Sequence, residues 1–597
     1  MNRPGFLPTL VLWLLLAVKS HAELQVGTPL LGFDGKVLPN TFTILSFEVS
    51  NRGAQAFDGD LVLRDLASGA PLKQAVFLAP GTSRWVQFHP YVGNYAPGWK
   101  LSWNDGRDRD KDMGQPDSSG PASRENFGAP ATVLLADPDS PGMRTARMRI
   151  FAENLFPTTV SATDGLAAVV LDHQPRWDAP RREAFLDWVR RGGTVHLVAG
   201  ADGAAVQFSD DFAALNIAGG ADRQRVGAGL VVKHPIARAE MTEQWLKEHG
   251  FATADLRSDG KGNIHDPDGF VLHKLAAITR PNINWGLIYL LTVAYVIFIG
   301  PVFYVLRKRN FRLLLGGFLA TVTLFAWAFT VIGRRGYGEK QIYHSIAIAR
   351  SLGAGRFDVH EWIHSFATEG GIYKFTHGDG SQLYATGFEG DTVRGEIREG
   401  KDSHLVADIP LFSSRPFLHR GVMKADDPAL KVEEWTESDG VARQFGPGGA
   451  TVPMKAFRVS AAPEFRKRVI TAVLERNGLY AELTLTAGGF ELPANGTTKP
   501  PETFFGQNQY YDNGRYYGSY DDAESVVREL RTLHPFFICL ANGDPAHFHK
   551  YLAQPARGAD HARIFIYAEA PPGFAMKNDR FESGKSLVLY VADLFKP

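Results

Sequence analysis

The stretch that decides the architecture is INWGLIYLLTVAYVIFIGPVFYVL (residues 283–306), followed by RKRNFR (307–312) and LLLGGFLATVTLFAWAFTVIG (313–333). Each apolar segment is long enough to cross a bilayer as a helix, because about 20 residues at about 1.5 Å each match a hydrocarbon core of about 30 Å. The connection is basic, and Lys and Arg in short loops favour the cytoplasmic side. The sequence therefore predicts a transmembrane hairpin with a cytoplasmic loop, which leaves both large flanks outside, where they can touch each other.

The N-terminus predicts the same orientation. Residues 1–22 combine Arg3, a short apolar run and the small residues Ser20 and Ala22. This pattern is typical of a secretory signal peptide, and its apolar run is too short to cross a membrane. An uncleaved anchor is the alternative, and it would leave the topology of the rest unchanged. We therefore expect a bacterial inner-membrane protein with two spans and both flanks in the periplasm.

Composition narrows the possible partners. Acidic and basic side chains balance at 64 each, so the net charge gives no electrostatic reason to expect binding of nucleic acid.

The chain has a single cysteine, Cys539, in an apolar run, so an intramolecular disulfide cannot form and a buried thiol is expected. The chain must therefore be held together by apolar cores, and its length allows several of them.

Residues 23–115 predict a β-sandwich. Leu45, Phe47 and Val49 alternate with polar residues, as in a strand with one buried face, and turn-forming residues follow them. An immunoglobulin-like sandwich is the expected form. A polar, proline-containing linker is expected at 116–129.

Residues 130–280 change to an α/β pattern. A helix with apolar residues at helical spacing is expected at 179–191, where Gly192 follows its last turn. Three continuous apolar runs have the composition of strands that are buried on both faces: 131–136, 167–171 and 194–198. This order predicts a βαβ unit with a parallel, flavodoxin-like sheet.

The segments AAVVLDH (167–173) and FLDWVRRGGTV (185–195) resemble the class I glutamine amidotransferase-like fold of bacterial envelope proteins. In active members of that group a cysteine follows the strand that matches 194–198, on a turn where a helix N-terminus lowers its pKa. This chain has AGADG at 199–203 instead. The resemblance therefore implies a domain that has lost its nucleophile and is kept for binding or architecture.

Three polar residues lie near the ends of these strands, where such sheets bind ligands: Asp172, His173 and Asp202. Ordinary polar loop residues are the alternative interpretation of each.

The hairpin carries a second resemblance. Gly300 and Pro301 inside the first span, followed by the basic exit at Arg307, resemble a group of uncharacterised bacterial inner-membrane proteins. Those proteins carry an amidotransferase-like domain before the hairpin and β-rich domains after it, and no reaction is assigned to them. Pro301 removes one helical hydrogen bond, so a kink in the first span is expected.

Residues 336–597 predict extracytoplasmic β-rich domains, in the form of one or two β-sandwiches. The candidate strands are 342–349, 373–376, 393–398, 456–459, 481–486, 536–540, 563–568 and 586–590. Two segments in this region carry candidate binding residues: a tyrosine-rich loop at 504–520, and His547 with His549.

One motif argues for an enzyme. His360-Glu361-Trp362-Ile363-His364 matches the zinc peptidase pattern, in which two histidines one helical turn apart bind zinc and the glutamate activates water. The pattern requires a helix, but the alternation of this segment is equally typical of a strand. As a strand it would place the two histidines about 13 Å apart, too far to share a metal.

A third zinc ligand could come only from residues farther along the chain, His377, Glu389 or Glu396. The preferred hypothesis is therefore a non-catalytic, membrane-anchored envelope protein without a cofactor, whose periplasmic domains bind a protein partner or envelope component. The alternative hypothesis is a zinc-dependent envelope metallopeptidase with His360 and His364 as ligands and Glu361 as general base.

Overall fold

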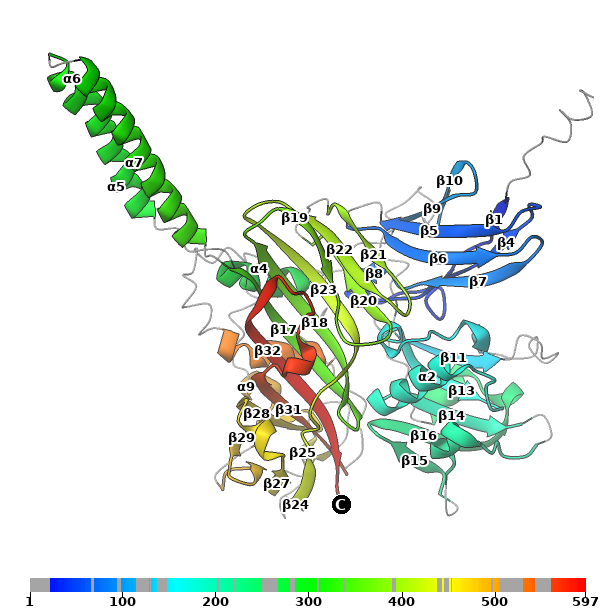
Figure 1. Ribbon diagram of the computed structural model, residues 1–597. Coiled ribbons are helices and arrows are strands. Elements are labelled where there is room, and N and C mark those ends of the chain that lie inside the picture. Colours follow the sequence, from blue (N-terminus) through cyan, green and yellow to red (C-terminus); the bar gives the residue numbers. More distant parts are fainter. Residues whose placement is uncertain are drawn as a thin grey trace, which may run out of the picture.

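The structure of the chain is a computed structural model. It describes residues 22–65, 69–93, 98–113, 128, 130–136, 148–200, 203–217, 221–249, 267–279, 285–308, 311–337, 340–388, 393–437, 443–444, 450–451, 454–494, 498–504, 530–542 and 560–597. Figure 1 shows a body of β-sheets and one α/β unit, from which a helical hairpin projects.

The N-terminal unit consists of two sheets around one apolar core that contains Leu45, Phe47 and Val49. The first sheet contains β1 (Leu24–Val26), β2 (Leu30–Leu31), β4 (Leu45–Asn51) and β7 (Ser83–Phe88). The second begins with β10 (Asp108–Asp112), β9 (Trp99–Asn104), β5 (Phe57–Asp65) and β6 (Leu72–Leu78). A separate short pair is formed by β3 (Thr41–Phe42) and β8 (Tyr91–Val92). The predicted alternation thus produces strands with one face in the core.

The α/β unit contains the predicted parallel strands and helix. Its sheet has the order β12 (Ile150–Ala152), β11 (Ala131–Ala136), β13 (Leu166–Leu171), β14 (Thr194–Ala199), β16 (Gly229–Ala237) and β15 (Arg223–Val226). Only β15 of these strands runs antiparallel to its neighbour. Its helices are α2 (Ala179–Arg191) and α3 (Glu243–Glu248), with short 3₁₀ turns at η2 (Glu153–Leu155), η3 (Val160–Ala162), η4 (Asp210–Leu215) and η5 (Arg238–Glu240). Helix α4 (Pro267–Thr279) packs instead against the sheet that follows the hairpin (Figure 1).

The hairpin consists of two helices that are long and apolar enough to cross a membrane, over Trp285–Val305 and Leu314–Ile332. The first is divided into α5 (Trp285–Ile297), a π-helical turn η6 (Phe298–Val302) and α6 (Phe303–Leu306). The second is α7 (Phe311–Tyr337). Pro301 lies inside the π-helical turn. The α-helical hydrogen bonding is therefore interrupted at the position where a kink was expected from the proline.

After the hairpin, eleven of the described strands form one sheet. Its order is β20 (Gln382–Ala385), β23 (Ser413–Lys424), β18 (Arg356–Ala367), β17 (Gln341–Gly353), β32 (Phe581–Phe595), β31 (His561–Glu569), β28 (Val469–Arg476), β29 (Leu479–Leu485), β30 (Gly489–Glu491), β27 (Met454–Ser460) and β24 (Lys431–Glu437). Smaller elements are β25 (Arg443–Gln444), β26 (Ala450–Thr451), α8 (Pro463–Arg466), α9 (Pro501–Phe504), α11 (His534–Ala541) and η7 (Pro572–Phe574).

The two flanks of the hairpin share a sheet. Strands β21 (Gly395–Arg398), β22 (His404–Ile409) and β19 (Gly371–Phe375) extend the N-terminal sheet, because β21 pairs in parallel with β6. This 7-stranded sheet packs against the 11-stranded sheet around a common core, to which Ile363 and Phe375 contribute. Segments from before and after the hairpin therefore form one body (Figure 1).

One predicted strand is wrong. The apolar run 536–540 lies in helix α11, not in a strand. A short apolar run does not distinguish a buried strand from a buried helix by its pattern alone. Pro535 stands in the first turn of α11, where its fixed φ and missing N–H suit a helix start. The other seven predicted strands after residue 336 all fall on strands of the structure.

Candidate functional site

The segment with the zinc peptidase pattern is a strand. β18 pairs with β17 on one side and β23 on the other along its whole length. His360 and His364 lie on one face of this strand, about 13 Å apart at about 3.3 Å per residue, and Glu361 lies on the opposite face. The helical interpretation of this motif is therefore wrong. The backbone hydrogen bonds from β18 to its two neighbouring strands outweigh the local capping residues and the helical periodicity that favoured a helix.

The face that carries Glu361 contains a different group of side chains, which we call the Glu361 cluster: Glu361, His377 and His419. Glu361 and His419 are direct partners across the β18–β23 ladder, and His377 follows the end of β19. Glu361 Oε2 lies 3.4 Å from Nδ1 of His419 and 3.7 Å from Nε2 of His377. The three side chains are at most 2 % exposed, so bulk solvent does not reach them.

Two neighbouring side chains orient the imidazoles. The Oε1 atom of Gln382 accepts a hydrogen bond from Nε2 of His419 at 2.8 Å, and the Tyr384 hydroxyl lies 3.2 Å from Nδ1 of His377. Gln382 in turn donates through Nε2 to the Asp379 carbonyl at 3.1 Å, which assigns its amide orientation. Each ring therefore turns its other nitrogen toward Glu361.

Burial dominates the electrostatics of the cluster. It raises the pKa of Glu361 above its ordinary value, against the influence of His377. It lowers the pKa of His419 to about 3, and burial together with the neighbouring His419 lowers the pKa of His377 well below its ordinary value. Both imidazoles are thus neutral near pH 7, and neutral imidazoles are metal ligands. Chemically, the arrangement offers two nitrogen lone pairs and a carboxylate oxygen, a donor set that can hold a metal ion.

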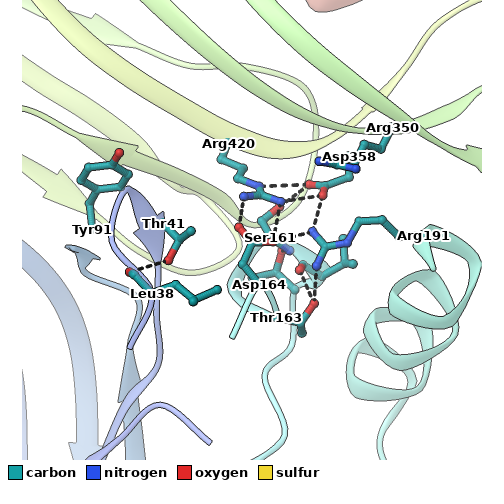
Figure 2. A network of polar contacts seen from close by, with 12 residues as sticks. Leu38, Thr41, Tyr91, Ser161, Thr163, Asp164, Arg191, Arg350, Asp358 and Arg420 are labelled. Carbon is teal, nitrogen blue, oxygen red and sulfur yellow. Dashed lines mark hydrogen bonds and ion pairs between the residues drawn. The ribbon is translucent and has the colours of Figure 1, made fainter. Parts of the chain in front are cut away.

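The other face of β18 and β23 carries charges that are fully paired, as Figure 2 shows. We call this group the ion cluster: Asp164, Arg191, Asp358 and Arg420. Arg420 binds Asp358 at 2.8 Å and also binds Asp164. Arg191 of α2 lies 2.5 Å from Asp358 and 2.9 Å from Asp164. The cluster joins the α/β unit to the large sheet.

The ion cluster holds its carboxylates ionised. Burial by itself would raise the pKa of Asp358, but the guanidiniums of Arg420 and Arg191 hold it far below its usual range. Ser161 of the α/β unit adds a hydrogen bond to Asp358 at 3.1 Å. Every oxygen of this carboxylate therefore has a partner.

At the carboxyl edge of the parallel sheet, Asp172 and His173 form an ion-paired group with Glu153. The ring of His173 lies 2.7 Å from Asp172 and 2.9 Å from Glu153. Burial would lower the pKa of His173, but these two acidic partners raise it to about 9. Asp172 also binds Arg238 at 3.0 Å. These charges neutralise one another, which favours a structural role for Asp172 and His173. The third residue predicted at this edge, Asp202, lies outside the described residues.

A pocket of about 280 Å³ lies beside the carboxyl end of β14. Its lining includes Ala199, Gly203, Gln207, Lys233 and His234. The pocket therefore occupies the region where the amidotransferase resemblance would place a nucleophile, and the residues at 199–203 contain neither Cys nor Ser.

The structure brings together two residues that the sequence analysis named separately, Glu361 and His377, and adds His419, which it missed. Glu396 binds Lys73 instead, and Glu389 lies outside the described residues. His419 could have been found from the sequence only by predicting that its strand pairs with β18. The tyrosines of the 504–520 loop, His547, His549 and nearly all of the signal segment also lie outside the described residues.

No family model matches this chain, and no curated protein matches it. Among solved structures, a cycloisomaltooligosaccharide glucanotransferase from Paenibacillus sp., complexed with cycloisomaltoheptaose, aligns over 79% of this chain and 98% of its own length. The identity is 8% and the TM-score is 0.14. Such a TM-score does not indicate a shared fold, so this likeness carries no argument here.

Proposed function

We propose that this protein is a non-catalytic envelope protein of the bacterial inner membrane, anchored by its hairpin, whose extracytoplasmic domains bind a protein partner or an envelope component. The observation that carries the proposal is the joint body formed by the two flanks. β6 precedes the hairpin and β21 follows it, and these strands are hydrogen-bonded neighbours. Strands cannot pair across a bilayer, which supports one common side for both flanks.

The ion cluster supports the same conclusion. Asp164 and Arg191 precede the hairpin, whereas Asp358 and Arg420 follow it. The basic loop between the spans supports a cytoplasmic position for the tip and therefore a periplasmic position for the body. The large exposed side chains of the hairpin, such as Leu290 and Val305, suit contact with lipid.

The finer fold assignments belong to this proposal. The two N-terminal sheets around one core support an immunoglobulin-like sandwich. The parallel sheet with α2 between β13 and β14 supports an amidotransferase-like domain. Binding is favoured over catalysis because the pocket at the end of β14 has a ligand-accepting position without the family's nucleophile.

Cysteine accessibility tests the topology. Ser83→Cys and Lys467→Cys place exposed thiols in the two flanks, and Lys308→Cys places one in the loop. Burial raises the pKa of the native Cys539 to about 12, so the unmodified chain is the control for background labelling. In intact spheroplasts, a membrane-impermeant maleimide should label the two flank variants and spare Lys308→Cys. Labelling of Lys308→Cys alone, or of only one flank, would contradict the proposal.

Site-specific photo-crosslinking tests binding. A crosslinking residue in place of exposed Gln207, at the rim of the pocket, should give a defined adduct in membranes. The same residue in place of Lys467 is the control for random contact. Equal adduct patterns at both positions, or none at Gln207, would remove the pocket as the binding surface.

A further inference from the structure

The geometry points to a binding site for a divalent transition-metal ion at Glu361, His377 and His419. Zinc is the ion that suits these ligands best. The donor set is that of protein zinc sites with two histidines and one carboxylate. This inference does not depend on the membrane topology or on the proposed binding function. It also differs from the peptidase motif, because His360 and His364 lie on the opposite face of β18.

The separations of the ligand atoms fit a zinc ion. In a tetrahedral site with metal–ligand distances of about 2.0–2.1 Å, two ligand atoms lie about 3.3 Å apart. The corresponding distances from Glu361 Oε2 are 3.4 Å to His419 and 3.7 Å to His377, and all three atoms lie within 4.8 Å of one another. The two distances from Glu361 Oε2 are too long for ordinary hydrogen bonds and close to the edge of a coordination tetrahedron.

The same three atoms lack hydrogen-bond partners. Within the described part of the chain, Oε2 of Glu361, Nε2 of His377 and Nδ1 of His419 are buried and make no hydrogen bond. A buried polar atom without a partner costs about 1–3 kcal/mol, more if charged. Three such atoms within 4.8 Å of one another are explained together by one cation.

The surroundings have the form of a second coordination shell. Metal-binding histidines usually use their remaining ring nitrogen to bind a carbonyl or similar acceptor, which fixes the tautomer. The Gln382 amide oxygen does this for His419, and the Tyr384 hydroxyl is placed to do it for His377. Gly421 leaves the room that Gln382 needs, because a Cβ at this position would lie 1.7 Å from Oε1 of Gln382.

The site would tie together three segments of the body. Glu361 lies on β18 and His419 on β23, while His377 follows β19 of the facing sheet. The two imidazoles are stacked, with ring centroids 3.7 Å apart and ring planes 11° apart, so their lone pairs run nearly parallel and binding of one ion by both requires the rings to turn toward each other. Because the site is buried, the ion would serve to join the two sheets.

Metal content of the full-length protein tests the site. The protein is expressed in zinc-supplemented medium, purified in detergent without chelator and analysed by inductively coupled plasma mass spectrometry. We expect about one Zn²⁺ per chain, and Co²⁺ in its place should give the visible absorption of a four-coordinate site. His377→Gln and His419→Gln should each lose the bound metal, with circular dichroism confirming that they fold.

His360→Gln is the matched control, because it makes the same chemical change one residue away on the other face of β18. It should retain the metal. Gln382→Ala keeps all three ligands and should weaken zinc binding about 10–100-fold in competition with a chromogenic chelator. The inference is overturned if the wild-type protein binds neither Zn²⁺ nor Co²⁺, or if His419→Gln and Gln382→Ala bind them as tightly as wild type.

Discussion

Two faces of the same pair of strands, β18 and β23, carry two buried polar clusters of opposite character. On one face Asp358 and Arg420 belong to the ion cluster, in which every carboxylate meets a guanidinium. On the other face Glu361 and His419 share burial with His377, but their facing atoms have no hydrogen-bond partner in the described structure. Equal burial thus has different consequences, because only the first cluster contains its own counter-charges.

The comparison separates two roles for buried polar groups. The ion cluster joins the α/β unit to the large sheet with charges that the chain itself supplies. The Glu361 cluster offers only a carboxyl group, whose pKa burial raises, and neutral rings, and the proposed metal ion would supply the positive charge that the described residues do not place there. Four predictions test this contrast.

The largest effect is expected from Asp358→Asn. It leaves the buried guanidiniums of Arg191 and Arg420 with one shared carboxylate, that of Asp164, in place of two, so one buried positive charge loses its partner, which costs about 3–5 kcal/mol. Native-state proteolysis measures this as a lower free energy of opening between the α/β unit and the sheet. Lys467→Ala removes an exposed ion pair with Glu464 and should leave proteolysis unchanged. Equal sensitivity of the two variants would show that the ion cluster does not hold the units together.

The second effect distinguishes the clusters by their response to zinc. With free Zn²⁺ at about 100 times its dissociation constant, the wild-type protein should gain about 2.7 kcal/mol of stability. His419→Gln should gain none, whereas Asp358→Asn should gain as much as the wild type. Thermal unfolding with and without zinc measures the difference. An equal gain in His419→Gln would place the zinc elsewhere.

The third prediction uses pH in the absence of metal. The folded pKa of His419 is about 3, below its unfolded value of about 6.5, so its contribution is complete above pH 6.5 and is lost as pH falls toward 3. The pKa of Asp358 is also lowered, so its contribution is lost only below about pH 4. Glu361 opposes the histidine, because its raised pKa costs stability as pH rises above its unfolded value.

Denaturant unfolding between pH 7 and pH 3 checks this order. Between pH 6.5 and 4.5 the His419→Gln variant should lose less stability than the wild type, by up to about 1.4 kcal/mol per pH unit. His360 is a less informative comparison, since burial lowers its pKa to about 3 as well. Identical slopes for wild type and His419→Gln would contradict the burial of a neutral His419.

The smallest effect is expected from Tyr384→Phe, which removes the hydroxyl beside His377. The loss of one buried hydrogen bond costs about 1 kcal/mol, and zinc affinity should fall as well. Tyr567→Phe is the matched control, because its buried hydroxyl donates to the Leu530 carbonyl instead. It should cost similar stability and leave zinc affinity unchanged. A loss of affinity in both variants would indicate a general loosening of the fold.

Much of the local structure could be predicted from the sequence. The apolar runs at 131–136 and 194–198 became β11 and β14, since strands buried on both faces need continuous apolar residues. The run at 536–540 was misassigned, because its composition suits a buried helix equally well. The joint sheet through β6 and β21 had no local signal, as its partners lie far apart in the chain.

The candidate site shows the same limit more sharply. The sequence analysis named Glu361 as the general base beside His360 and His364, and His377 only as one of three possible third ligands, because spacing along the chain was the only geometry available. The strand conformation reversed this grouping, since neighbouring residues in a strand point to opposite faces. His419 entered only through the register of β23 against β18.

The two apolar helices, the alternation of strand faces and the parallel α/β unit follow from the amino-acid sequence, because the length and period of apolar runs are properties of adjacent residues. That the two flanks form one body, and that Glu361 faces His377 and His419, emerges only in the folded chain. Strand pairing and burial are set by contacts between distant segments, and no local pattern encodes which distant side chain a buried carboxylate meets.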